Sequence, residues 1–347
     1  MKNICSITIV LFVVSVLILV FNCCYSVDKI DESSGENETT NYVKSIEIFP
    51  DELSNDNIGK PRSLSLKQIK KEIGSINENE NQIDEQRISI VIMDSGVYPH
   101  EDIAKRIILS KDFVNNKILP YDDTGHGTSV AGIASYFNNA DIISLKVLDH
   151  NNNTKIEDVI MAFRWILDNH QTYRIRVVNV SISLTTDKCD KELKELCNEL
   201  KDAGIIVVAS SGNEEDMKYY PAVYESVLAV GSIGITEQGA CYISAFGISG
   251  IYQQNKNKPD ILSFGERVIT CDTCSLYKGN PEEKRKTIYS YHYESGTSFS
   301  CAVVTGIIGS LIEQMPGEDI DKVVSMLLSG KTIFDPYTRR NIPITVY

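Results

Sequence analysis

The residues Ile88-Ser89-Ile90-Val91-Ile92-Met93-Asp94-Ser95-Gly96 give the clearest indication of the fold class of this chain. The first six of them form a β-branched, apolar run of the length of one strand, and a glycine turn follows. Side chains alternate between the two faces of a sheet, so a run this apolar needs cover on both faces. The pattern is typical of a strand inside a parallel sheet.

Further apolar runs alternate with helical stretches along the chain. The expected strands are Asp141–Leu148, Arg176–Ile182, Gly204–Ala209 and Val227–Gly231. The expected helices are Ser63–Ile73, Thr128–Tyr136, Lys155–Asn169 and Lys191–Ala203. This alternation predicts an α/β fold, a mostly parallel sheet with helices on both faces, within a single domain. In such a sheet, ligands bind at the carboxyl ends of the strands.

Length, composition and charge restrict the class of protein. The chain has 347 residues, 42% of them hydrophobic and 23% charged, which is the composition of a folded globular chain of one or two domains. Its formal net charge is −13. A nucleic-acid binder needs basic side chains that displace counterions from phosphates. We therefore expect no nucleic-acid partner.

Residues 1–26 have the features of an export segment. A basic start precedes an apolar run from Ile4 to Phe21, and small residues follow near Ser26. The run is long for a cleaved signal and close to the length of a membrane span, so a signal peptide and a retained N-terminal anchor both stay open. We expect the rest to be secreted, or extracellular and membrane-anchored. The polar residues 27–62 would be a linker or the short propeptide of a zymogen.

Cysteines beyond the export segment could form disulfides in an exported chain. They are Cys189, Cys197, Cys241, Cys271, Cys274 and Cys301. Cys271 and Cys274 form a lone CxxC without the second pair of a zinc site, so a loop disulfide and two free thiols are the alternatives. The pairing of Cys189 with Cys197 stays open.

Four polar residues stand at expected strand ends or helix starts. Asp94 leaves the first strand, and Asn213 follows a later strand behind a glycine. His126 lies between two glycines, and Ser298 opens an apolar helix beside backbone N–H groups without helical partners. Each alone could be a turn residue, a structural histidine or a helix cap. Together they predict one site at one edge of the sheet.

The order Asp94, His126, Asn213, Ser298 resembles that of the subtilisin-like serine proteases, or subtilases. The resemblance rests on Met93-Asp-Ser-Gly-Val97, Gly125-His-Gly-Thr-Ser-Val-Ala-Gly132, Ser211-Gly-Asn-Glu214 and Gly296-Thr-Ser-Phe-Ser300. It covers most of the chain, from about Ser63 onward. We therefore expect a single subtilisin-like peptidase domain at residues 63–347.

The resemblance implies a serine endopeptidase that hydrolyses peptide bonds in peptide or protein substrates. Ser298 would attack the carbonyl, His126 would accept and return the proton, and Asp94 would orient the imidazole. The amide of Asn213 and the backbone N–H of Ser298 would stabilise the oxyanion. Activity would rise as His126 loses its proton, around neutral pH.

Substrate contacts are expected from two segments by the same resemblance. Residues 178–182 resemble the family's substrate-lining strand, so Ser181, Ile182 and the next residue, Ser183, would contact the peptide. Glu214 and the two acidic residues after it would lie at the rim of the S1 pocket. Carboxylates beside a cleft favour cationic side chains, so we expect Lys or Arg at P1. A solvated acidic loop is the alternative.

The resemblance also bears on cofactors and on the biological role. The family's calcium-binding insertion is almost missing between Tyr136 and Asp141, and Asp102 alone cannot hold a cation that takes about six to eight oxygens. We therefore expect no metal and no cofactor, with calcium as the alternative. The role would be processing of peptide precursors by a monomer. Broad degradation by a secreted protease and peptide binding by an inactive module are the alternatives.

Overall fold

The computed structural model describes residues 61–74, 87–182, 184, 191–214, 219–247, 251, 254–273 and 290–346. The expected export segment, residues 1–26, lies outside this part, as does nearly all of the expected propeptide or linker, residues 27–62. Ser183, Cys189 and Cys274 are also outside it.

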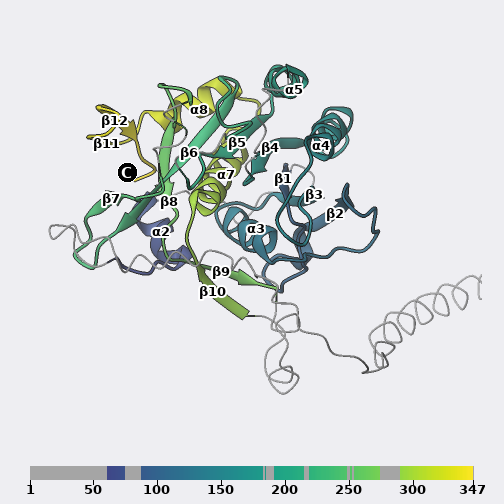
Figure 1. Cartoon of the computed structure of the whole chain (residues 1–347), viewed down its shortest axis with the longest axis horizontal. Coiled ribbons are helices and arrows are strands. Elements are labelled where there is room, and N and C mark those ends of the chain that lie inside the picture. Colours follow the sequence, from purple (N-terminus) through teal and green to yellow (C-terminus); the bar gives the residue numbers. More distant parts are fainter. Residues whose placement is uncertain are drawn as a thin grey trace, which may run out of the picture. The chain divides into compact units, whose positions relative to one another are not determined.

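A central eight-stranded sheet runs through the described part of the chain (Figure 1). Its strand order is β2-β3-β1-β4-β5-β6-β7, and β8 also pairs with β6. The strands are β1 (Ser89–Asp94), β2 (Ile107–Asp112), β3 (Asp141–Lys146), β4 (Ile175–Val180), β5 (Ile206–Ser210), β6 (Val227–Ile235), β7 (Cys241–Ile243) and β8 (Ile261–Phe264). Among these pairs only β6 with β7 is antiparallel, which confirms the predicted α/β class with a mostly parallel sheet.

Helices and two small strand pairs complete the described fold. The helices are α2 (Leu66–Ile73), α3 (His126–Tyr136), α4 (Ile156–Asn169), α5 (Lys191–Asp202), α7 (Thr297–Gln314) and α8 (Ile320–Leu328). The strand pairs join β9 (Val268–Asp272) to β10 (Ser290–Glu294) and β11 (Thr332–Asp335) to β12 (Arg340–Pro343).

Strand β1 shows why both faces of the sheet carry helices. Ile90 and Ile92 belong to a hydrophobic core that includes residues of α3 and α7, whereas Val91 and Met93 belong to a second core with α4 and α5. All four side chains are fully buried. Each such burial stabilises the fold by roughly 1.5–3 kcal/mol. In Figure 1, α3 and α7 accordingly lie on one side of the sheet and α4 and α5 on the other.

The predicted elements are present, with small shifts at their ends. Helix α2 begins at Leu66 and not at Ser63, because Ser65 caps it: Gln68 N–H donates to Ser65 Oγ, and Ser65 N–H donates to Gln68 Oε1. Strand β6 continues to Ile235, beyond the expected end at Gly231.

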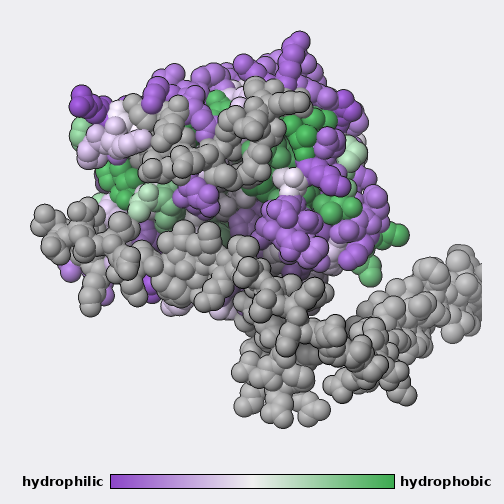
Figure 2. All heavy atoms as spheres, in the orientation of Figure 1, coloured by the Kyte–Doolittle hydropathy of each residue, from purple (hydrophilic) through white to green (hydrophobic). Residues whose placement is uncertain are grey.

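The described surface is mainly hydrophilic on the face in view (Figure 2). On the face shown in Figure 2, hydrophilic side chains cover most of the described surface and hydrophobic ones form separate patches. No helix within the described ranges combines the length and apolarity of a membrane span.

Cys197, Cys241, Cys271 and Cys301 are free thiols. Of the two alternatives for the CxxC pair, a loop disulfide and two free thiols, the structure therefore has Cys271 as a thiol.

Candidate active site

Asp94 is the last residue of β1, and its side chain is fully buried. Its Oδ1 accepts a hydrogen bond from Ser95 N–H at 2.7 Å and lies 2.7 Å from His126 Nδ1. Its Oδ2 is buried without a hydrogen-bond partner in the described part of the chain. A buried carboxylate so poorly hydrated is stabilised by positive charge on the adjacent imidazole.

His126 is the first residue of α3, and the glycines beside it allow its approach to β1. Gly125 has φ 89°, in the left-handed region that favours glycine. A Cβ at Gly127 would lie 2.0 Å from the carbonyl oxygen of Gly96 and 3.1 Å from the Cβ of Asp94. Only a residue without a side chain fits there, so the two glycines bring the imidazole and the carboxylate together.

Asp122 holds the loop that carries His126, a role that the sequence analysis missed. Its Oδ1 accepts from Ser95 Oγ at 2.8 Å and from the N–H groups of Thr124 and Gly125 at 3.1 and 2.9 Å. Its Oδ2 accepts from the N–H and Oγ1 of Thr128 at 2.9 and 2.6 Å. An aspartate just before a glycine turn at a helix start is the sequence signal that could have found it.

Lys146, at the end of β3, holds the neighbouring turn and was also missed. Its side chain is 3% exposed, and its Nζ donates at 2.7 Å to the carbonyl oxygens of Ser95 and Leu148. It also forms an ion pair of 2.9 Å with Asp123 Oδ2. The ammonium therefore ties β3 to the residues that follow Asp94 and precede His126.

The charges around His126 control its protonation. Burial lowers the pKa of His126, but Asp94, by its charge and its hydrogen bond, raises it further, as do the charges of Glu294 and Asp122. The net result is a pKa of about 9. The expectation that His126 loses its proton around neutral pH is therefore revised to alkaline pH.

Ser298 lies in the first turn of α7, beside the end of β4. Its Oγ donates to the carbonyl oxygen of Ser181 at 3.3 Å, and Ser181 Oγ donates to the carbonyl oxygen of Ser298 at 3.0 Å. The ring of the next residue, Phe299, lies 5.5 Å from the His126 ring, measured between centroids. The structure thus brings the serine and the histidine to the same edge, but between these two described side chains it has no hydrogen bond.

Asn213 is fixed by the residue before Ser298. The N–H and Oγ1 of Thr297 both donate to Asn213 Oδ1 at 2.9 Å, and Gly212 N–H donates to Thr297 Oγ1 at 3.1 Å. Two donors on one atom identify that atom as the amide oxygen, so Nδ2 faces away from Thr297. The Ser298 N–H, in the first helical turn, has no partner within the helix. Asn213 is thus held by the residue next to Ser298, and its Nδ2 and the Ser298 N–H are the candidate donors of this site.

The expected substrate-binding residues divide into two groups. Ser181 and Ile182 follow β4 directly and are 4% and 5% exposed, and Ser181 contacts Ser298 as described. Glu214 is exposed, and its N–H donates to the hydroxyl of Tyr219 at 2.7 Å. Ser183 lies outside the described residues, as do the two acidic residues after Glu214.

Known proteins share this sequence pattern. The subtilase family profile matches residues 85–333. Serine protease AprX of Bacillus subtilis (strain 168) is 28% identical over 268 residues, 70% of this chain and 61% of that protein. Thermitase of Thermoactinomyces vulgaris is 27% identical over 239 residues, 65% of this chain and 75% of thermitase. Minor extracellular protease Epr of Bacillus subtilis (strain 168) is 32% identical over 169 residues, 45% of this chain and 25% of that protein.

These matches establish the family and leave part of some relatives uncovered. The chain spans 61% of AprX and 25% of Epr, less than two thirds of either protein. The family match, in contrast, covers well over half of this chain and contains both β1 and the start of α7. The chain belongs to the subtilase family of serine peptidases.

Proposed function

We propose that this chain is a serine endopeptidase in which Ser298 is the nucleophile, His126 the general base and Asp94 the residue that orients the imidazole. The observation that carries the proposal is the 2.7 Å contact of His126 Nδ1 with Asp94 Oδ1 at the same sheet edge as Ser298. That contact places the proton on Nδ1 and leaves Nε2 to accept from the nucleophile when the ring is neutral.

In the proposed reaction the protons move through His126. Ser298 Oγ leaves the carbonyl of Ser181 by a rotation about χ1, gives its proton to His126 Nε2 and bonds to the substrate carbonyl carbon. The imidazolium, stabilised by Asp94, then protonates the leaving amine. A water molecule then attacks the acyl-enzyme in the same way: it gives a proton to His126 and bonds to the acyl carbon, and His126 returns the proton to Ser298 Oγ as the product leaves. Side chains and backbone groups supply all of this chemistry, so we propose no cofactor for it.

The oxyanion of the tetrahedral intermediate would be held by Asn213 Nδ2 and the Ser298 N–H. Thr297 supports this role, because its two hydrogen bonds fix the orientation of the Asn213 amide before substrate arrives. Donors that are already oriented need no reorganisation when negative charge develops.

A comparison of Ser298→Ala with Ser300→Ala tests the proposal. Ser300 lies in the same helix, is fully buried, and its hydroxyl has no hydrogen-bond partner among the described residues, so its loss should leave turnover close to wild type. Ser298→Ala should abolish peptide hydrolysis to within a residual background. Hydrolysis at the wild-type rate by Ser298→Ala would overturn the assignment of the nucleophile.

We propose a preference for Lys or Arg at P1, supported by the exposed carboxylate of Glu214 beside Asn213. Matched peptides with Arg or Phe at P1 test it. Cleavage should be faster after Arg, and Glu214→Gln should reduce the ratio of the two rates, because a carboxylate attracts the cationic side chain. Faster cleavage after Phe would contradict the proposal.

We propose that the natural role is the processing of peptide precursors by a secreted or membrane-anchored monomer. A relative named as an extracellular protease supports export. The cleavage profile of a peptide library separates the two candidate roles: a narrow profile supports processing, and a broad one supports general degradation.

A further inference from the structure

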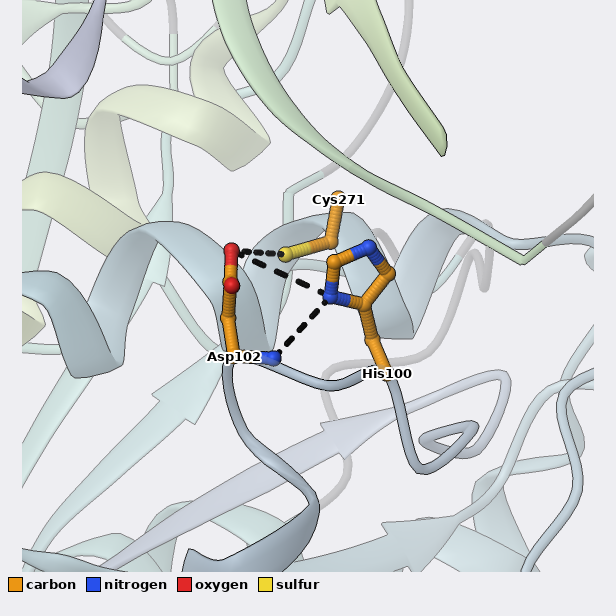
Figure 3. A group of neighbouring side chains, drawn as sticks. All are labelled: His100, Asp102 and Cys271. Atoms are coloured by element: carbon orange, nitrogen blue, oxygen red, sulfur yellow. Dashed lines mark hydrogen bonds and ion pairs between the residues drawn. The ribbon is translucent and has the colours of Figure 1, made fainter. Parts of the chain in front are cut away.

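Three side chains of types that bind metals, from two distant segments, meet next to α3, the helix that begins with His126 (Figure 3). They are His100, Asp102 and Cys271, and one donor atom of each lies within 4.8 Å of the others. His100 is fully buried and Cys271 is 3% exposed, whereas the side chain of Asp102 is 47% exposed. The cluster is therefore enclosed by protein on one side and open to solvent at Asp102.

The distances between these donor atoms suit an ion with tetrahedral coordination. Asp102 Oδ2 lies 3.8 Å from His100 Nδ1 and 3.7 Å from Cys271 Sγ. Zinc binds nitrogen and oxygen at about 2.0–2.2 Å and thiolate at about 2.3 Å, so neighbouring tetrahedral ligands are roughly 3.3–3.7 Å apart. The distance from Asp102 to Cys271 lies at the upper end of that range, the distance from Asp102 to His100 lies just above it, and the third pair is within 4.8 Å. Side-chain rotations would close these distances around one ion.

Packing alone explains only part of this arrangement. Cys271 Sγ packs against α3 at Gly132. A Cβ added at Gly132 would lie only 2.6 Å from this sulfur, so the close packing explains the glycine in α3 and a small side chain at Cys271. This packing does not account for the carboxylate of Asp102 beside the thiol.

The ligand types select the ion. A thiolate and an imidazole are borderline or soft ligands that suit zinc, whereas calcium takes about six to eight oxygens. Zinc deprotonates a coordinating thiol, and the proton is released to solvent. Tyr291 would support the third ligand, because its hydroxyl donates to Asp102 Oδ2 at 2.8 Å.

We propose that His100, Asp102 and Cys271 form a structural zinc site, with a water as fourth ligand. The ion would replace the long 3.3 Å hydrogen bond from Asp102 N–H to His100 Nδ1. It would join the segment after Asp94 to strand β9. Both already contact α3, through Tyr98 N–H to Thr128 Oγ1 at 2.9 Å and Ser129 Oγ to the Cys271 carbonyl at 2.9 Å. Zinc would thus stabilise the two segments that flank the helix carrying His126.

No local sequence pattern links these three residues. Asp102 was considered alone as a calcium ligand and Cys271 as half of a CxxC. Asp102 and Cys271 are 169 positions apart in the sequence, and their contact arises only from the pairing of β9 with β10 and the packing of β9 on α3.

Metal binding to the full chain carrying Ser298→Ala tests the proposal without self-cleavage. Ser298 is not a ligand, so the readout does not depend on the proposed peptidase activity. One equivalent of Co²⁺ should give a thiolate-to-metal charge-transfer band, and excess Zn²⁺ should remove it. Zn²⁺ should also raise the midpoint of thermal unfolding, since a ligand that binds only the folded state stabilises it.

Variants then assign the ligands. Cys271→Ser should remove the band, and Cys197→Ser, which changes another buried thiol, should keep it. Asp102→Asn alters an exposed side chain and should weaken binding at least 10-fold, and Tyr291→Phe roughly 10-fold. Absence of stoichiometric binding, or a band that survives Cys271→Ser and Asp102→Asn, would overturn the site and leave the peptidase proposal untouched.

Discussion

The raised pKa of His126 leads to a quantitative prediction for the pH dependence of catalysis. A general base must be unprotonated, so kcat/KM should increase as pH rises through the pKa of the free enzyme. With a pKa of about 9, only about 1% of His126 is neutral at pH 7, and activity there should be about one hundredth of the alkaline plateau. An ordinary histidine pKa of about 6.5 would leave roughly three quarters of the plateau at pH 7.

The assay is kcat/KM for one peptide measured from acid to strongly alkaline pH, with Glu294→Gln as the perturbation. Glu294 is among the charges that raise the pKa of His126, and its side chain is 32% exposed. Its neutralisation should move the rising limb toward lower pH without lowering the plateau. Glu318→Gln, which removes an exposed carboxylate paired with Lys322, is the matched control and should leave the limb in place. A wild-type limb with its midpoint at or below pH 6.5 would refute the reasoning.

The raised pKa of His126 also predicts that the stability and the activity of the protein change in opposite directions with pH. The pKa of His126 is higher in the folded than in the unfolded chain, so the folded state holds its proton more tightly. This contribution to stability is fully present below about pH 6.5 and is lost as pH rises through about 9. The unfolding midpoint of Ser298→Ala should therefore fall across this interval, and a further His126→Ala change should reduce that fall.

Three further predictions follow from the contacts around the site. Asn213→Ala should lower kcat by about 10²- to 10³-fold with little change in KM, the cost of losing one oxyanion donor in this family; an unchanged kcat would exclude the role. Lys146→Met should lower the free energy of unfolding by roughly 3 kcal/mol in urea titrations, because it leaves buried acceptors without a donor, whereas the exposed Lys111→Met should have little effect. Gly127→Ala should lower kcat/KM by about 10²-fold, because the added Cβ pushes His126 away from Asp94; wild-type kinetics would contradict this geometry.

The fold was predictable because its signal is local. Strand β1 is apolar at every position from Ile90 to Met93, and only a sheet covered on both faces buries such a run. The start of α3 was less clear, because His126 and Gly127 carry no helical apolar pattern. The structure includes them in the helix, since side chains accept from the free N–H groups of its first turn. The N–H of His126 donates to Thr124 Oγ1, that of Gly127 to Ser95 Oγ and that of Thr128 to Asp122 Oδ2.

The supporting residues of the site were not predictable from local patterns. Lys146 ends an apolar strand, where a lysine is ordinarily the exposed end of the run, yet its side chain is only 3% exposed. One of its acceptors, the carbonyl of Ser95, lies 51 residues away in the sequence and becomes its neighbour only because β3 pairs with β1. A buried ammonium is stable when several acceptors surround it, and the tertiary structure alone decides this.

The Ser298 hydroxyl donates to the carbonyl of Ser181, and the charge of His126 decides whether the imidazole can compete for this proton. An imidazolium has two donors and no acceptor nitrogen, so Ser298 cannot donate to it. With a pKa of about 9, His126 is largely in this form at neutral pH and cannot then take the proton that the hydroxyl donates to the carbonyl of Ser181. Above that pKa, Nε2 becomes an acceptor and competes with the carbonyl for the same proton. The alkaline rise in activity should therefore follow the loss of the proton that the carboxylate of Asp94 stabilises on the imidazole.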